Sequence, residues 1–95
     1  MKDIYVVKFS KKAKHDLKKI PWYLALKLES WVSAVGISGL SDIRKINGYN
    51  DELLKGDRAG QRSIRLNKAY RAIYIIDDDG DIDFVEIIEV TKHEY

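Results

Sequence analysis

Two arginines in the second half of this 95-residue chain have the residue type and spacing that phosphate binding requires. Arg65 lies between two apolar residues, so in an extended strand its side chain points away from them. If residues 67–69 form a three-residue turn, Arg65 lies directly opposite Arg71 on the next strand. Facing like charges repel each other, and a bound phosphate removes that repulsion because its oxygens match the guanidinium fork. The pair therefore predicts an anion-binding site.

The charges around the arginine pair leave a second interpretation open. Arg62 and Lys68 add positive charge nearby. Alternatively, each arginine of the pair forms an ion pair with an acid on the adjacent strand, such as Glu86 or Glu89. Both arrangements satisfy the guanidinium groups, and only the first needs a ligand.

The chain ends in His93-Glu94-Tyr95, directly after the last expected strand. If this segment stays extended, His93 and Tyr95 point to one side, roughly 6–7 Å apart. A histidine suits proton transfer near neutral pH, and a tyrosine can exchange a proton or stack on a base. The alternative is a frayed terminus with an incidental histidine. Placement beside the arginine pair favours a functional role.

A β-α-α-β-β-β order of elements would position these residues. Hydrophobic periodicity and turn residues predict a first strand, two helices that Pro21 separates, a loop and three further strands. Ser10 is the expected N-cap of the first helix, and Gly36 and Gly39 end the second. We expect one α+β domain, residues 1–95, with an antiparallel sheet and both helices packed on one of its faces. The expected strands are 3–9, 62–66, 70–76 and 82–91, and the expected helices are 11–20 and 22–35.

Composition narrows the classes of function. The chain has no cysteine, which excludes a disulfide framework and a thiolate metal site. Residues 1–76 carry 16 Lys and Arg against 7 Asp and Glu, whereas residues 77–95 carry 1 Lys against 8 acids. The basic part suits a polyanionic partner, although such a charge run is often only a solvated surface. Because neither a signal peptide nor a membrane-spanning run is evident, we expect a cytoplasmic protein, with no metal or other cofactor.

Three segments together resemble the RelE/ParE toxin superfamily of type II toxin–antitoxin systems. They are Glu52-Leu53-Leu54-Lys55-Gly56-Asp57, Gly60-Gln61-Arg62-Ser63-Ile64-Arg65-Leu66 and Tyr70-Arg71-Ala72-Ile73-Tyr74. With the C-terminal His-x-Tyr, the resemblance covers the chain from about residue 48 to its end, and the helical half matches only in layout. The order and spacing of the segments are more specific than any one of them, and the YoeB, RelE and HigB branch is the most similar.

The resemblance implies a microbial-RNase-like fold and an endoribonuclease that cleaves mRNA in the ribosomal A site and so inhibits translation. It also implies a cognate antitoxin protein that neutralises the toxin. Glu52 matches the carboxylate that acts as general base, Arg65 the arginine that stabilises the phosphate, and Arg71 a second phosphate-contacting arginine. His93 and Tyr95 match the adjacent His-Tyr of YoeB-like toxins approximately, because Glu94 separates them here.

These residues would suffice for metal-independent cleavage by the RNA 2′-hydroxyl, which leaves a 2′,3′-cyclic phosphate and a 5′-hydroxyl. Glu52 or His93 is the candidate base, and Tyr95 or His93 is the candidate acid. Arg65 and Arg71 would stabilise the charge that develops on the phosphate. The residues expected to bind the RNA backbone are Lys55, Arg58, Arg62, Lys68 and Lys92.

Two other functions fit the same sequence. A ParE-like toxin of this fold would inhibit DNA gyrase and would need neither Glu52 nor His93. A non-catalytic RNA- or ribosome-binding module would bind with a steep salt dependence and leave no cleavage products. The C-terminal His-Glu-Tyr favours the ribonuclease. The helices could form the antitoxin-binding face of a toxin–antitoxin hetero-oligomer, with Trp22 and Trp31 as anchors there unless both belong to the core.

Overall fold

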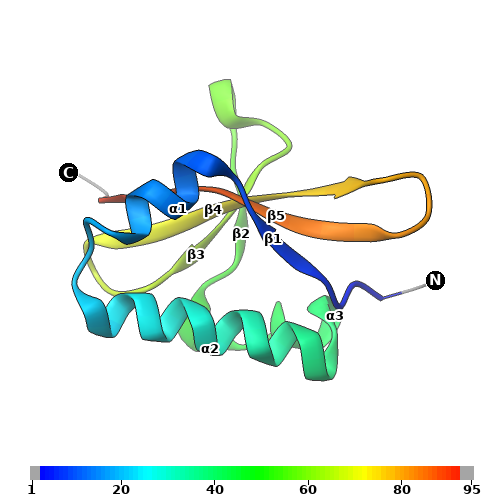
Figure 1. Ribbon diagram of the computed structural model, residues 1–95, viewed down its shortest axis with the longest axis horizontal. Coiled ribbons are helices and arrows are strands. Elements are labelled where there is room, and N and C mark those ends of the chain that lie inside the picture. Colours follow the sequence, from blue (N-terminus) through cyan, green and yellow to red (C-terminus); the bar gives the residue numbers. More distant parts are fainter. Residues whose placement is uncertain (1–2, 93–95) are drawn as a thin grey trace.

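A computed structural model describes residues 3–92, so the candidate site residues His93 and Tyr95 lie outside the described part of the chain. One five-stranded sheet lies between helix α2 and a loop that rises from its opposite face (Figure 1). The strands are β1 (Val7–Phe9), β2 (Glu52–Leu53), β3 (Arg62–Arg65), β4 (Tyr70–Asp78) and β5 (Asp83–Lys92). The helices are α1 (Lys11–Leu17), α2 (Trp22–Ser38) and α3 (Leu40–Ile43), with the 3-10 turns η1 (Asn47–Tyr49) and η2 (Gly56–Arg58). None of the helices in this described range is long and apolar enough to cross a membrane.

The strands are arranged in the order β1-β5-β4-β3-β2. The pairs β3–β4 and β4–β5 are antiparallel, as predicted, and so is the pair β2–β3, whose first strand was not expected. Strand β1 runs parallel to β5. Parallel neighbours need a long connection between them, and the helices that follow β1 form part of that connection. The predicted α+β class is confirmed, and the sheet is mixed because of this one edge pair.

Helix α2 covers one face of the sheet and makes most of the core with it (Figure 1). Its buried residues Leu24, Leu28, Trp31 and Val35 recur with the helical period that the sequence predicts. The helix continues past Gly36 to Ser38, and Gly39 ends it with a positive φ of 87°. Trp31 is therefore a core residue, whereas Trp22 is 74% exposed.

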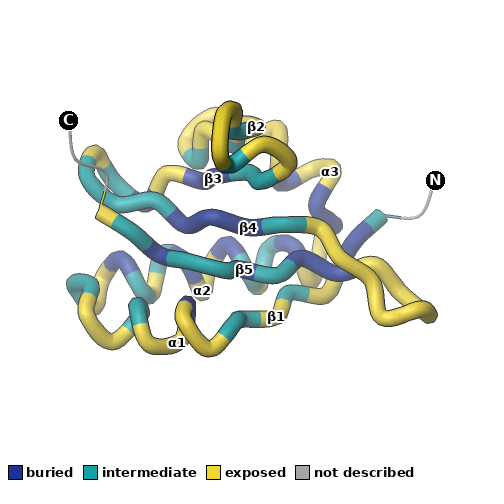
Figure 2. The backbone as a smooth tube through the Cα atoms, turned by 90° about the horizontal axis from the view of Figure 1, so that it is seen from above, coloured by how far each residue is buried: buried dark blue, intermediate teal, exposed yellow. Residues whose placement is uncertain are grey.

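Helix α1 lies along the edge of β5, beyond the end of the short strand β1 (Figure 2). Strand β1 pairs only with residues 85–87 of β5, so the backbone of residues 88–90 has no strand beside it on that edge. Two side chains of the α1 region bond this backbone instead. Ser10 donates from its hydroxyl to the Ile88 carbonyl at 3.1 Å, and the Asp16 carboxylate accepts from the Val90 amide at 3.0 Å. Ser10 also caps α1, as predicted, by accepting from the Ala13 amide.

The segment 40–61, expected to be a loop, contains α3, η1, β2 and η2. Strand β2 joins the sheet beside β3, and the chain then passes over the face that α2 leaves open (Figures 1 and 2). This segment therefore brings Glu52 and Arg58 towards the strands that carry the arginine pair.

Candidate active site

The arginine pair has the register that the sequence predicts. Arg65 pairs directly with Arg71 across β3 and β4. The turn between these strands is held by Asn67, whose side-chain oxygen accepts from the amides of Ala69 and Tyr70, both at 2.8 Å. Two guanidinium groups thus lie side by side on one face of the sheet.

Arg71 lies beside two polar groups that come from the edge of the sheet. Its Nη1 donates to Glu52 Oε1 at 3.3 Å and to Ser63 Oγ at 3.4 Å. The Arg71 side chain is only 15% exposed, whereas the Glu52 side chain is 50% exposed. The acid that pairs with Arg71 is therefore Glu52, and neither Glu86 nor Glu89 takes that position.

A hollow of about 380 Å³ opens over this part of the sheet. Strands β2–β5 and the loop after β2 contribute its walls, because side chains at alternate strand positions point to this face. The lining residues are Glu52, Leu54, Arg58, Ser63, Arg71, Ile73 and Thr91. The hollow therefore combines one accessible carboxylate with two guanidinium groups.

Arg58 reaches the hollow from η2 and is held from two sides. Its Nη1 donates to Gln61 Oε1 and its Nη2 to Glu89 Oε1, each at 2.9 Å. Glu89 thus pairs with an arginine, as the alternative interpretation expects of an acid on β5, although the partner comes from the loop. These two contacts hold the Arg58 guanidinium at the edge of the hollow, where it can bind an anion.

The other predicted phosphate ligands lie apart from the hollow. Arg65 shares its face but does not line it, and it makes no hydrogen bond or ion pair with any part of residues 3–92. Lys55, Lys68 and Lys92 are exposed and do not line it either. The structure thus unites Glu52, Arg71 and Arg58, and leaves Arg65 beside them.

Arg62, expected to bind RNA, points to the opposite face, where α2 lies. Its Nε donates to Asp51 Oδ1 at 2.7 Å, and the Asp51 side chain is 1% exposed. Burial lowers the pKa of Arg62, but the bond with Asp51 outweighs it and leaves that pKa above its usual value. Burial, together with Asp51, also raises the pKa of the neighbouring Tyr74. Arg62 already has an acid partner and is not placed to bind a ligand on the open face.

From the sequence alone, no role was assigned to three residues that shape this region. Ser63 lies in one of the quoted motifs, and the structure shows that it is fully buried and bonds Arg71. Asp51 binds Arg62 from the segment before β2, and Thr91 lines the hollow from β5. The alternation of β3 was the available signal for Arg62 and Ser63, because it places them on opposite faces.

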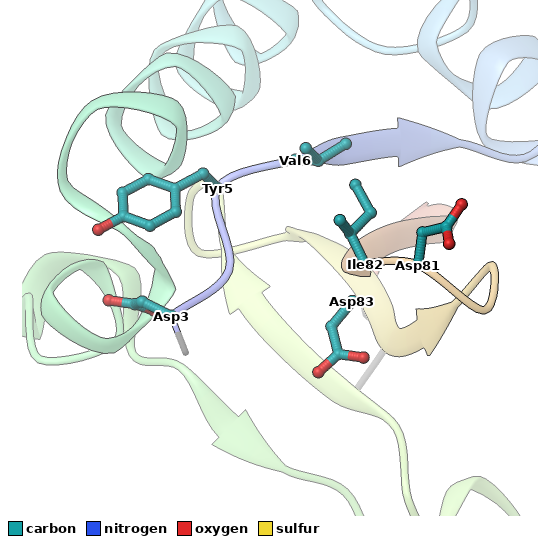
Figure 3. Close-up of a pocket in the computed structure, with 6 residues that line it drawn as sticks. All are labelled: Asp3, Tyr5, Val6, Asp81, Ile82 and Asp83. Atoms are coloured by element: carbon teal, nitrogen blue, oxygen red, sulfur yellow. The ribbon is translucent and has the colours of Figure 1, made fainter. Parts of the chain in front are cut away.

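A second cavity, of about 220 Å³, lies between the N-terminal segment and the β4–β5 hairpin (Figure 3). Its lining residues are Asp3, Tyr5, Val6, Asp81, Ile82 and Asp83. Three carboxylates there would repel phosphate, so this cavity does not suit a nucleic-acid backbone. Nowhere in residues 3–92 do three or more His, Asp or Glu side chains gather as metal ligands do.

The hollow on the open face can bind an anion and move a proton. A carboxylate held at a guanidinium can accept a proton from a hydroxyl, while the guanidinium stabilises negative charge on a neighbouring oxygen. The half-exposed position of Glu52 leaves it accessible to a substrate.

Comparison with known proteins gives one match to a family. The sequence matches the model of the ParE toxin of the type II toxin–antitoxin system parDE over residues 7–93. Among curated proteins, none matches the sequence significantly.

Solved structures share the fold. A YoeB/ParE toxin from Agrobacterium tumefaciens has 18% identity and a TM-score of 0.69, with 94% of this chain and 99% of that chain covered. YafQ from E. coli has 16% identity and a TM-score of 0.71, with coverage of 92% and 91%. A chain of the RelBE2 toxin–antitoxin complex from Mycobacterium tuberculosis has 27% identity and a TM-score of 0.63, with coverage of 95% and 99%.

Proposed function

Because this chain belongs to the ParE toxin family of type II toxin–antitoxin systems, we propose that it is a toxin that cleaves RNA with its own side chains. The observation that supports this proposal best is the contact between Glu52 and Arg71, 3.3 Å apart at an accessible hollow. The substrate is mRNA, and its site of cleavage is the ribosomal A site, as the resemblance to YoeB, RelE and HigB implies.

The proposed reaction is attack of the RNA 2′-hydroxyl on the adjacent phosphorus. Glu52 takes the proton of the 2′-hydroxyl, the 2′-oxygen–phosphorus bond forms, and the bond from phosphorus to the 5′-oxygen breaks. Arg71 and Arg65 stabilise the negative charge on the phosphorane oxygens. His93 or Tyr95, outside the described residues, gives a proton to the leaving 5′-oxygen. The products are a 2′,3′-cyclic phosphate and a 5′-hydroxyl, and no metal takes part.

In the absence of substrate, the ion pair with Glu52 satisfies the charge of Arg71. A substrate phosphate competes with the Glu52 carboxylate for the Arg71 guanidinium, because both are anions suited to its donors. Once the phosphate is bound, the carboxylate is released beside the 2′-hydroxyl. Arg58, at the rim of the hollow, would hold a neighbouring phosphate of the same strand.

A second function, inhibition of DNA gyrase, is favoured by one observation: the matching family model is that of ParE toxins. Such a toxin would not need the Glu52 carboxylate for chemistry. The two functions differ in what stops first in an induced culture. Translation stops for the ribonuclease, whereas replication stalls with a DNA-damage response for the gyrase inhibitor.

We propose a cognate antitoxin as the partner, because toxins of this family act in toxin–antitoxin systems. The structure of RelBE2, which shares this fold, is itself a toxin–antitoxin complex. The outer face of α2 suits such a protein, since it exposes Trp22 at 74% and Ile37 at 81%. Ile37 also lines a shallow groove together with Leu26.

The test is primer extension on a defined mRNA in a reconstituted translation system, with and without ribosomes. The wild-type toxin should give discrete cuts, and Glu52→Gln should slow them by about 10²–10⁴-fold because the base is lost. Arg71→Ala should slow them by about 10²–10³-fold. Lys19→Ala, which removes one exposed charge on the surface, is the matched control and should cleave normally. Cuts of wild-type strength by folded Glu52→Gln would contradict the assignment.

A further inference from the structure

Strand β2 carries Glu52, yet few backbone contacts hold this strand. It has only two residues, both exposed, at the open edge of the sheet. One more backbone bond follows it, from the Leu54 amide to the Gln61 carbonyl at 2.8 Å. A two-residue edge strand frays easily when nothing else secures it. The position of Glu52 therefore depends on a further contact.

Asp51, directly before β2, provides such a contact. Its side chain is 1% exposed, and both of its carboxylate oxygens have a donor. Arg62 Nε donates to Oδ1 at 2.7 Å, and the Tyr74 hydroxyl donates to Oδ2 at 2.5 Å. Since a buried carboxylate is costly without partners, these two bonds fix where the Asp51 side chain can lie.

The partners of Asp51 connect it to the core of the protein. Arg62 and Tyr74 are direct neighbours across β3 and β4. The Tyr74 ring is fully buried and packs against Trp31 of α2, with 5.4 Å between the ring centroids. Asp51 is thus bonded through Tyr74 to the core of the molecule.

Asp51 and Glu52 contact opposite faces of the sheet. The partners of Asp51 lie on the face that α2 covers, whereas Arg71, the partner of Glu52, lies on the open face. Consecutive side chains of an extended chain point in opposite directions. A side chain fixed at Asp51 therefore directs the next one, Glu52, towards Arg71.

We propose that Asp51 is a positioning residue that anchors β2 through Arg62 and Tyr74 and thereby holds the Glu52 carboxylate beside Arg71. The consequence for catalysis rests on the proposed role of Glu52 as base. The consequence for the position of β2 does not, so the two can be tested apart.

The first test measures cleavage by two variants that remove different halves of the anchor. Asp51→Asn keeps the size of the side chain and removes its charge, and Tyr74→Phe keeps the buried ring and removes the hydroxyl. Single-turnover cleavage of ribosome-bound mRNA should slow by about 10²-fold in Asp51→Asn, because a small displacement of a catalytic group has that effect. KM should stay at or fall below its wild-type value, since the hollow still binds phosphate and a displaced Glu52 competes less for Arg71. Asp42→Asn, an exposed acid in α3, is the matched control.

The second test measures hydrogen exchange, which does not depend on activity. The Leu54 amide should exchange faster in both variants than in the wild type, while the amides of β4 and β5 keep their protection.

If Asp51→Asn does not fold, Tyr74→Phe gives the answer. Unchanged exchange at Leu54 in a folded variant would overturn the proposal. A loss of rate that merely equals the loss of folded protein would overturn its catalytic part. If the wild type cleaves no RNA, the proposed function is wrong. The exchange result then still tests whether Asp51 anchors β2.

Discussion

Arg65 and Arg71 face each other across two strands, yet only Arg71 has an acid partner within residues 3–92. Repulsion between facing like charges costs up to about 1 kcal/mol. Glu52 relieves part of it at Arg71, and Arg65 keeps its charge exposed at the surface. This arrangement is typical of a binding site that gives up some stability in the absence of its ligand.

Removal of Arg65 should therefore separate stability from activity. We expect Arg65→Ala to leave the free energy of unfolding unchanged or to raise it by up to about 1 kcal/mol. RNA cleavage should fall by about 10²–10³-fold, because a charge that stabilises the phosphorane is lost. Urea denaturation and the primer-extension assay measure the two effects. Inorganic phosphate should stabilise the wild type more than Arg65→Ala, and equal stabilisation of both would contradict an anion site here.

The buried Tyr74 should make stability fall at high pH. Burial raises the pKa of Tyr74, and its bond to Asp51 adds to that effect. The unfolded chain loses this proton near the ordinary pKa of about 10, while the folded chain keeps it. The unfolded state then binds fewer protons, so stability decreases as pH rises above that value. Tyr74→Phe lacks the group, and the difference in unfolding free energy between it and the wild type should shrink above about pH 10. Parallel stability curves would contradict this expectation.

The arginine pair could be predicted from the sequence because strand alternation and a three-residue turn are local properties. Glu52 could be assigned to the site from its motif, but the motif did not indicate that Arg71 is its partner. Which acid meets which arginine depends on where segment 40–61 crosses the sheet, and nothing local in the sequence specifies that path. For Arg62 the local pattern was sufficient. Arg62 is two residues before the core residue Ile64, which places both on the covered face, although the charge of Arg62 suggested a ligand.

At the scale of elements, α1 illustrates what periodicity cannot predict. Its buried Ala13 marks the side that faces the protein, but not whether that side meets a face or an edge of the sheet. The edge position follows from the length of β1, which ends before the backbone of β5 is satisfied. The Asp16 carboxylate then completes the bonding of β5 at Val90.

Loss of the Asp16 carboxylate should destabilise the fold. Burial raises the pKa of Asp16, but bonds from Lys12 and the Val90 amide outweigh burial and hold that pKa below its usual value. Asp16→Ala should lower the free energy of unfolding by about 1–3 kcal/mol, because the Val90 amide loses its acceptor. Asp16→Asn keeps an acceptor and should lose less. The Asp16 contribution is present at neutral pH and disappears as pH falls through the lowered pKa. Thermal unfolding of both variants measures the effect, and equal losses would contradict it.

Helix α2 carries apolar side chains on two sides. One side forms the core, and the other exposes Trp22, Leu26 and Ile37, with polar side chains between the last two. Exposed apolar side chains that gather on one face commonly mark a binding surface. The sequence predicted the first side and left the roles of Trp22 and Trp31 open, because both fit the same helix.

Replacement of Trp22 should weaken binding of the antitoxin without a loss of stability. Large aromatic side chains at the centre of an interface commonly contribute about 2 kcal/mol or more to binding. Isothermal titration of Trp22→Ala with the co-encoded antitoxin should show a weaker affinity and an unchanged melting temperature. Lys11→Ala, at the exposed start of α1, is the control. Wild-type affinity would place the antitoxin on another surface.

At the scale of the whole molecule, charge is separated along the longest direction. The acidic β4–β5 hairpin extends from one end, and the β3–β4 turn lies at the other (Figures 1 and 2). Arg65 and Arg71 are the strand pair next to that turn. An approaching polyanion is therefore oriented with its backbone towards the hollow and away from the hairpin. The sequence shows this separation as a basic segment followed by an acidic one. In the folded protein the two kinds of charge lie towards different ends of the molecule.

Affinity for a non-cleavable 2′-deoxy oligonucleotide should depend steeply on salt. Each phosphate contact with a single strand contributes about 0.7 to the slope of log affinity against log salt. Arg58→Ala should reduce the slope by about one such contact. Asp78→Asn, in the hairpin, should leave the slope unchanged, since it removes no phosphate contact. Fluorescence anisotropy measures both variants, and a wild-type slope for Arg58→Ala would show that Arg58 does not bind phosphate.

The sheet narrows from strands of nine and ten residues at its centre to strands of three and two residues at its margins. Unpaired strand backbone is where other chains add and fibrils begin. On the β5 side, α1 occupies the backbone that β1 leaves uncovered. On the opposite side, β2 offers only two residues and one of them is charged. The short strands at both edges thus leave little unpaired backbone to which a second copy of the protein could add.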